Sequence, residues 1–243
     1  MRLTFAAIVA AATLAACSNN DNPINPPIGQ LRVANAISDS TNVQSSVESV
    51  SANDTLAFGQ ATGEHDLFDG NYLVHLTANS TTPVASHTFD ANPVNIDKNH
   101  VTTVFAVGKM ANTSEEAFIV EAPDNDIQSN QSEVQLVDVA SNQTGSVDIY
   151  ITAPGASLVG ELPKATLAFK SSNDPVIYTP GSYAIRVTPA GVPATILFDS
   201  GAIDFPAQAT DQFVLIDRTC GGSTFALMVI EGSVPGSHVV GGC

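Results

Sequence analysis

The sequence has few positively charged side chains. It contains 8 Lys and Arg residues against 24 Asp and Glu residues, which gives a formal net charge of −16 at pH 7. Binding to nucleic acid needs clustered Lys and Arg that displace counterions from phosphates, and adsorption to anionic lipids needs similar clusters. The composition therefore argues against both kinds of partner, and we expect the acidic surface to serve solubility.

Long apolar runs are also lacking. The uncharged run from Leu3 to Ala16 has about 14 residues, whereas a helix needs roughly 20 to span a membrane. A short run of this kind after Arg2, ending in small residues, is typical of a cleaved secretory signal, which we place at residues 1–16. The tetrad Leu-Ala-Ala-Cys that ends at Cys17 resembles a bacterial lipobox, which implies that Cys17 carries a lipid anchor.

Residues 17–29 contain many Asn and Pro residues and few that can be buried. We therefore expect the lipidated Cys17 to be followed by a flexible, solvated tether. Ser18 occupies the position where an Asp typically marks lipoproteins that stay at the inner membrane. By this resemblance we expect the protein in the cell envelope, at the outer membrane if the host is Gram-negative.

Cysteine is scarce, and two cysteines remain once Cys17 is assigned to the lipid. In an oxidising compartment an even number of cysteines favours a disulfide, so we predict a bridge between Cys220 and Cys243. This bridge would hold the glycine-rich tail, residues 233–243, against the loop that contains Cys220. Two unpaired thiols are the alternative, and the spacing of His and carboxylate residues does not indicate zinc.

Helical periodicity is almost absent after Cys17. Short runs rich in Val, Ile, Thr, Phe and Tyr are instead separated by Gly, Pro, Asn or Asp, a pattern typical of an all-β antiparallel sandwich or barrel. In the run that contains Arg186 apolar residues alternate with it, so Arg186 should point outward. The clearest predicted strands are Leu31–Ala36, Val101–Val107, Glu133–Val139, Val147–Thr152, Tyr183–Thr188, Gln212–Asp217 and Thr224–Ile230.

The sequence contains an internal repeat. Thr55-Leu56-Ala57-Phe58 recurs as Thr166-Leu167-Ala168-Phe169, and at the same offset Gly70-Asn71-Tyr72 recurs as Gly181-Ser182-Tyr183. We interpret the first motif as a short core strand. In the second motif the Gly permits a tight turn, and the Tyr buries its ring while its hydroxyl bonds to a backbone group.

The repeat predicts two Ig-like antiparallel β-sandwich domains in tandem. We place the first at residues 30–122 and the second at residues 132–232. The polar segment 123–131 is predicted to be a linker, and residues 233–243 a C-terminal tail.

The second repeat also resembles a known family. The segments that carry the resemblance are Val134–Ser141, Gly145–Ile151, Pro180–Tyr183 and Leu197–Asp199. Their succession resembles the bacterial domain-of-unknown-function family numbered 4397, whose members are exported β-sandwich domains, often in tandem. The resemblance covers most of residues 132–230 and, more weakly, residues 30–122, which implies two copies. It supports the fold and the export, and it implies no activity.

Motifs of catalytic chemistry are lacking. The sequence has no Gly-X-Ser-X-Gly elbow, phosphate-binding loop, dinucleotide fingerprint or His-Glu-X-X-His. None of the histidines, His65, His75, His87, His100 and His238, has a counterpart at its aligned position in the other repeat. We therefore predict no catalytic residue and no cofactor.

Two acidic segments are candidate calcium sites. Residues 124–126 (Asp-Asn-Asp), with Gln128 and Glu133, are faintly similar to a calcium loop, but they lack the Gly at its sixth position and the acid at its twelfth. Asp66 and Asp69 could bind calcium at a domain edge. Turn and linker roles explain both segments more simply, so we predict no metal site.

These observations predict a membrane-anchored lipoprotein that acts as a non-enzymatic binding or structural module of the cell envelope. A rigid stack of sandwiches suits the presentation of loops to a glycan or to an envelope protein. The alternatives are a carboxylate- or metal-dependent hydrolase and an architectural envelope protein strengthened by calcium.

Overall fold

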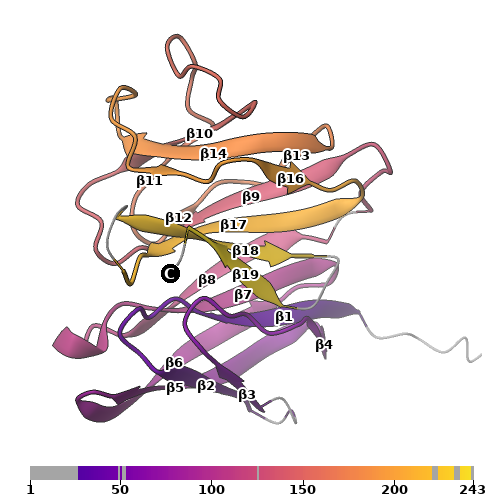
Figure 1. The fold of residues 1–243 in the computed structure, drawn as a ribbon. Coiled ribbons are helices and arrows are strands. Elements are labelled where there is room, and N and C mark those ends of the chain that lie inside the picture. Colours follow the sequence, from indigo (N-terminus) through magenta and orange to yellow (C-terminus); the bar gives the residue numbers. More distant parts are fainter. Residues whose placement is uncertain are drawn as a thin grey trace, which may run out of the picture.

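The computed structural model of the chain describes residues 27–48, 50, 53–124, 126–220, 224–232 and 236–241. The described elements are β-strands, apart from the short 3-10 helix η1 (Met110–Asn112), so the predicted all-β fold is confirmed. In the part of the chain that is described, no helix has the length and apolar character needed to cross a membrane. The strands form four sheets that lie one upon another (Figure 1).

The first sandwich consists of two four-stranded sheets. Its strands are β1 (Ile28–Asn35), β2 (Asn42–Val47), β3 (Asn53–Leu56), β4 (His65–Phe68), β5 (Gly70–Thr81), β6 (Val84–Ile96), β7 (His100–Val107) and β8 (Glu116–Pro123). The outer sheet has the strand order β3-β2-β5-β6, and the inner sheet has the order β4-β1-β7-β8. Apolar side chains from the facing sides of these sheets form the first core.

The second sandwich repeats this plan with additional short strands. They are β9 (Ser132–Asp138), β10 (Val147–Thr152), β11 (Ala165–Leu167), β12 (Ser171–Ser172), β13 (Val176–Tyr178), β14 (Gly181–Pro189), β15 (Phe198–Asp199), β16 (Ile203–Phe205), β17 (Ala209–Asp217), β18 (Phe225–Glu231) and β19 (Ser237–Val240). The outer sheet is β11-β10-β14-β15, with β16 also on β14. The inner sheet is β12-β9-β17-β18-β19, with β13 also on β9. The clearest predicted strands are all present, as β1, β7, β9, β10, β14, β17 and β18.

One strand pair in each inner sheet is parallel. β1 pairs in parallel with β7, and β9 pairs in parallel with β17. The sequence pattern led us to expect antiparallel pairing, which the other pairs of described strands have. Alternation of apolar residues is the same in a parallel and an antiparallel strand, so the sequence could not reveal this difference.

The internal repeat has a structural counterpart at both of its motifs. Leu56 and Leu167, from the two Thr-Leu-Ala-Phe segments, are each 5% exposed and belong to the cores of their sandwiches. The hydroxyls of Tyr72 and Tyr183 each donate to the backbone oxygen four residues earlier, at 3.0 Å and 2.8 Å respectively. The core role of the two Leu residues and the hydroxyl bonds of the two Tyr residues are therefore confirmed, whereas the strands end at these Leu residues and the Tyr residues are only partly buried.

A third apolar core joins the two sandwiches. It lies between the inner sheets and consists of Ala34, Ala36, Ala61, Phe105, Val107, Val120, Val137, Val139, Val214, Ile216, Ala226, Met228 and Ile230. The equivalent residues Phe58 and Phe169 pack against it. The two sandwiches are thus fused face to face, with β7, β9 and β17 buried on both faces (Figure 1).

The segment predicted to be a C-terminal tail, residues 233–243, contains β19, which contacts both sandwiches. β19 pairs with β18 of the second sandwich. The Ser237 hydroxyl accepts a hydrogen bond from the Ala61 N–H at 2.8 Å and donates to the Gly59 carbonyl at 2.9 Å, both in the first sandwich. The tail therefore adds a strand to the inner sheet and ties it to the neighbouring sandwich.

Arg186 is buried, contrary to the prediction that it reaches solvent. Its neighbours Ile185 and Val187 face the core, so Arg186 does leave the opposite face of β14. The loop between β10 and β11 covers that face, and the residue is 5% exposed. Its guanidinium donates to the Ala156 carbonyl and to the Thr152 hydroxyl. Alternation identifies the face of a strand but not the loop that covers it.

Candidate functional site

A network of polar side chains interrupts the core between the inner sheets. Arg32 and Thr103 are register partners on β1 and β7, and Gln135 and Gln212 are register partners on β9 and β17. Gln212 Oε1 accepts hydrogen bonds from the Thr103 hydroxyl at 3.0 Å and from Arg32 Nη1 at 3.5 Å. Gln212 Nε2 donates to Gln135 Oε1 at 2.8 Å, so both sandwiches contribute to one network.

The network joins equivalent positions of the two repeats. Arg32 and Gln135 each stand three residues before a turn residue, Asn35 or Asp138. The side chain of that residue accepts a hydrogen bond from the backbone N–H two residues later. Thr103 on β7 and Gln212 on β17, the register partners of Arg32 and Gln135, also occupy equivalent positions in the two repeats. The two repeats therefore meet through matching positions whose residue types have diverged.

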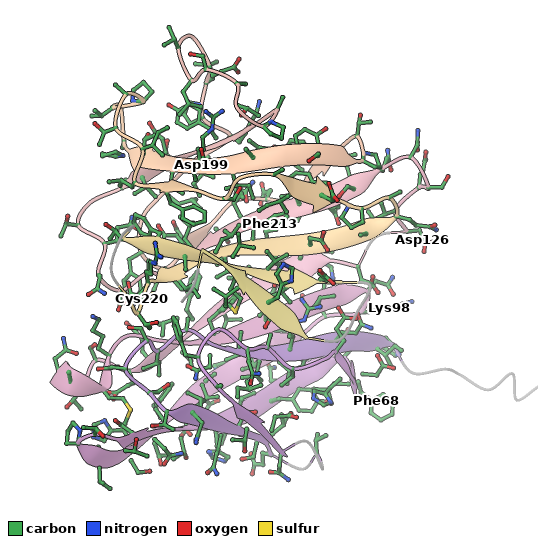
Figure 2. The ribbon with its side chains drawn as sticks, in the orientation of Figure 1. Phe68, Lys98, Asp126, Asp199, Phe213 and Cys220 are labelled. Atoms are coloured by element: carbon green, nitrogen blue, oxygen red, sulfur yellow. The ribbon has the colours of Figure 1, made fainter. Side chains whose placement is uncertain are left out.

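A pocket of about 420 Å³, which we call the between-sandwich pocket, adjoins this network. Both sandwiches and the segment between them form its walls: Arg32, Glu64, Val101, Ala122, Pro123, Asp124, Asp126, Ile127, Gln208, Ala209, Thr210, Gln212 and Gly232. Asp126 lies at the side of the stack where β17 begins (Figure 2). The volume suits a small ligand or one unit of a longer one.

An ion pair between Arg32 and Glu64 forms part of the pocket wall. Their side chains are 5% and 24% exposed. Burial lowers the pKa of Arg32 and raises the pKa of Glu64, and the attraction between the two charges opposes both shifts. Asp124 and Asp66 add to the rise in the pKa of Glu64. Removal of either partner would leave the other charge uncompensated in a poorly solvated place.

The pocket lining combines hydrogen-bonding and apolar groups. The carboxylates of Glu64, Asp124 and Asp126 can accept hydrogen bonds from hydroxyl, amide or amine groups of a ligand. Val101 and Ile127 offer apolar contacts beside them. A few polar groups within a partly apolar wall are typical of sites that bind and orient a small ligand.

Asp217, the last residue of β17, lies at another part of the interface between the two sandwiches. Its carboxylate is buried and accepts hydrogen bonds from the Ser141 hydroxyl at 2.6 Å, the Asn142 N–H at 2.8 Å and the Ser38 hydroxyl at 3.2 Å. Ser38 and Ser141 stand at equivalent places in the two repeats, three residues after the turn residue of β1 or β9. Lys109 Nζ lies 4.0 Å from the carboxylate. One acid thus holds the matching turns of both sandwiches together.

Of the residues in the cysteine predictions, Cys220 is the one that the structure describes. Cys220 is disulfide-bonded. Cys17 and Cys243 lie outside the described residues, so lipidation and the Cys220–Cys243 pairing stay predictions. β19 runs back along β18, with Val240 beside Leu227, toward the loop that contains Cys220 (Figure 2). This is the direction that the predicted bridge requires.

The acidic side chains that are candidate calcium ligands line a pocket or accept hydrogen bonds from the protein. Asn125 lies outside the described residues, and the flanking Asp124 and Asp126 line the between-sandwich pocket. Asp66 and Asp69 accept hydrogen bonds from a glutamine side chain at 3.3 Å and from a backbone N–H at 3.4 Å. Within the described ranges, no three His, Cys, Asp or Glu side chains are grouped to hold a metal ion.

The histidines lie apart from one another, and four of them face a carboxylate. The pairs are His65–Asp54 (3.2 Å), His75–Asp90 (2.8 Å), His87–Glu115 (2.6 Å) and His238–Glu231 (3.5 Å). His75 is also the register partner of Ser46, which makes a Ser-His-Asp row across the outer sheet. The His75 and Asp90 side chains are 44% and 48% exposed, so the row lacks the water-excluded setting that strengthens catalytic electrostatics.

Sequence reasoning missed the buried polar residues of the inner sheets that form this candidate site, Arg32, Gln135 and Gln212. The available signal was their position within runs that carry apolar residues on both faces, such as Gln212–Asp217, because such runs are typical of doubly buried strands. A polar side chain in a strand of this kind needs a partner on the neighbouring layer.

The comparison with protein families gives one match. The family described as "Domain of unknown function (DUF4397)" matches residues 29–150, which span the first sandwich from the second residue of β1, the connecting segment, β9 and most of β10. No curated protein matches the chain. The match gives one copy, mostly in the first sandwich, and the second copy expected at 132–230 stays a prediction. Since this match covers half of the sequence, the chain belongs to the DUF4397 family.

Proposed function

We propose that this protein is an exported lipoprotein that binds a polar ligand, a glycan or a peptide, in the cell envelope without transforming it. Its anchor is a lipid on Cys17, at the outer membrane in a Gram-negative host. The support for the anchor is the short uncharged run and the lipobox-like tetrad before Cys17. The Asn- and Pro-rich residues 18–26 then separate the lipid from β1, which begins at Ile28.

The between-sandwich pocket is the observation that carries the binding role. It is formed by both sandwiches, and its polar lining is continuous with the buried network of Arg32 and Gln212. The third core fixes the two inner sheets against each other, so the pocket walls are held in one arrangement before a ligand arrives. Such preorganisation reduces the entropy lost on binding.

The anchor is tested by replacing the cysteine that accepts the lipid. Cys17→Ala should prevent lipidation and move the protein from the membrane fraction to the soluble fraction of the envelope. Metabolic labelling with a fatty acid, followed by fractionation and mass spectrometry of the mature N-terminus, measures this directly. Labelled protein in the Cys17→Ala variant would contradict the assignment, whatever the protein binds.

The binding role is tested with a substitution that fills the pocket. Mature protein should retain one or more ligands from arrays of envelope glycans and peptides, and Thr210→Phe should abolish that binding because its ring occupies the pocket. Thr88→Phe, at an exposed position of the outer sheet, is the matched control and should bind as the parent does. Unchanged binding in Thr210→Phe, or no ligand on either array, would overturn the assignment of this pocket.

A further inference from the structure

Asp211 is a buried acid on the far side of β17 from the between-sandwich pocket. It lies between Thr210 and Gln212, whose side chains line that pocket, so its own side chain points to the opposite face of the sheet. Asp211 is 1% exposed, and its Oδ1 has no hydrogen-bond partner among the residues that the structure describes. A buried acceptor without a donor is costly, which favours a partner from outside the chain.

Asp211 lines a second pocket of about 470 Å³, which we call the Asp211 pocket. The other lining residues are Ala202, Ile203, Asp204, Pro206, Val229, Glu231, His238 and Val240. β16 belongs to the outer sheet, whereas β17, β18 and β19 belong to the inner sheet, so the pocket lies at the side of the second sandwich between its two sheets. Apolar walls around a carboxylate suit a carbon chain that ends in a hydrogen-bond donor.

The groups that face Asp211 are mainly acidic. Glu231 is its register partner on β18, and Asp204 lines the same pocket. His238 Nδ1 lies 3.5 Å from Glu231 Oε1. Burial raises the pKa of Asp211 to about 6; Glu231 adds to the rise, while a backbone hydrogen bond and the charge of Arg32 across the sheet oppose it. The pocket therefore combines three acidic side chains with one histidine.

We propose that the Asp211 pocket binds an organic cation, a primary ammonium or guanidinium group on an aliphatic chain, whose N–H donates to Asp211 Oδ1. A cation supplies the missing donor and also compensates the charge of the three carboxylates, whereas a neutral hydroxyl supplies only the donor. A bare metal ion fits less well, because the described residues contain no group of three side chains able to coordinate one. The apolar walls contact the chain that carries the charge.

The first experiment compares a cation with a neutral molecule of the same length. In titration calorimetry of the mature protein, 1-aminopentane should bind at least about tenfold more tightly than pentan-1-ol. Asp211→Asn keeps the side-chain shape and should weaken amine binding by about tenfold or more, and Glu231→Gln by a smaller factor. Asp199→Asn, at an exposed position outside this pocket, should leave binding unchanged.

A second measurement uses pH. Amine binding should weaken as the pH falls from about 7.5 to about 5, because protonation of Asp211, whose pKa burial raises to about 6, removes its negative charge. Thermal unfolding checks the fold of Asp211→Asn, which loses a buried charge and should be at least as stable as the parent. Equal affinity for amine and alcohol, undiminished binding in Asp211→Asn, or no binding at ~10 mM amine would each overturn the proposal. Thr210→Phe separates the two pockets, since it blocks only the between-sandwich one.

Discussion

Asn35 and Asp138 occupy the same turn in the two repeats, yet only one of them can carry a charge. Both side chains accept a hydrogen bond from the backbone N–H two residues later, at 2.9 Å and 3.1 Å. Asn35 also donates to the Leu56 carbonyl at 3.0 Å. In the second repeat, Asp138 Oδ2 and Gln143 Oε1 are buried acceptors without a partner among the described residues, although the two side chains are in reach of each other.

Burial raises the pKa of Asp138 from its ordinary 3.8 to about 6. Between these values the folded state binds the proton more tightly than the unfolded state, so stability falls as the pH rises through this window. Asp138→Asn supplies a permanent donor, and we expect it to stabilise the protein at neutral pH by roughly 1–3 kcal/mol, with the gain vanishing near pH 4. Urea unfolding at several pH values measures this. The reciprocal Asn35→Asp should destabilise at neutral pH, and a less stable Asp138→Asn would contradict the argument.

Asp217 differs from Asp138, because hydrogen-bond donors surround its buried carboxylate. Its carboxylate accepts three hydrogen bonds from turns of both sandwiches. Asp217→Ala leaves those donors unpaired in a buried place and should lower the free energy of unfolding by about 2–4 kcal/mol. Urea titration tests this, with the exposed Asp174→Asn as a control that should change little. A loss no larger than that of the control would show that water replaces the carboxylate.

At the scale of elements, apolar alternation located the central strands of the two inner sheets and two strands of the second outer sheet, and it missed several others. β5 and β6 are long but carry polar residues toward solvent, and their pattern of burial alternates along most of their length. β12 and β15 have two residues each, too few to show any periodicity. Short strands of this kind are defined by their neighbours' hydrogen bonds rather than by their own sequence.

β19 and the disulfide of Cys220 together fix the end of the chain. We expect peptide mapping under non-reducing conditions to find Cys220 linked to Cys243. Replacement of both cysteines by Ser should lower stability by about 3 kcal/mol, the chain-entropy estimate for a loop of this length. Hydrogen exchange should then rise in β19 and in the segment of Gly59 and Ala61 that Ser237 contacts. Free thiols at both positions in the mature protein would refute the pairing.

At the scale of the whole molecule, the two sandwiches form one four-layer stack. Each inner sheet is covered on both faces, once by its own outer sheet and once by the other sandwich. Separation would expose side chains such as Phe105, Val107 and Met228, each of which is fully buried in the stack. An exposed apolar face of this kind favours aggregation, so neither sandwich is expected to be stable alone.

The mature protein should therefore unfold in one cooperative transition. Calorimetric and spectroscopic unfolding curves should coincide, because the third core couples the two sandwiches. A fragment of residues 27–123 should aggregate or bind a hydrophobic dye. Two resolved transitions, or a monomeric and folded fragment, would contradict this coupling. The intact chain studied under the same conditions is the control.

The sequence by itself determined the all-β class, the internal repeat and the central strands. These features follow from local alternation, turn residues and repeated motifs such as the Gly-X-Tyr turns of Tyr72 and Tyr183, which need no knowledge of distant contacts. It also provided the only evidence for export and for lipidation at Cys17.

Only the tertiary structure decided how the repeats are joined and where the candidate sites lie. Arg32, Asp211 and Gln212 are far apart from their partners along the chain, and nothing local to them indicates which layer each one faces. Their positions depend on the parallel pairing of β1 with β7 and of β9 with β17, and on the packing of two inner sheets whose apolar faces look alike in sequence. Burial on both faces is a property of the assembled stack, and the between-sandwich pocket exists only in that stack.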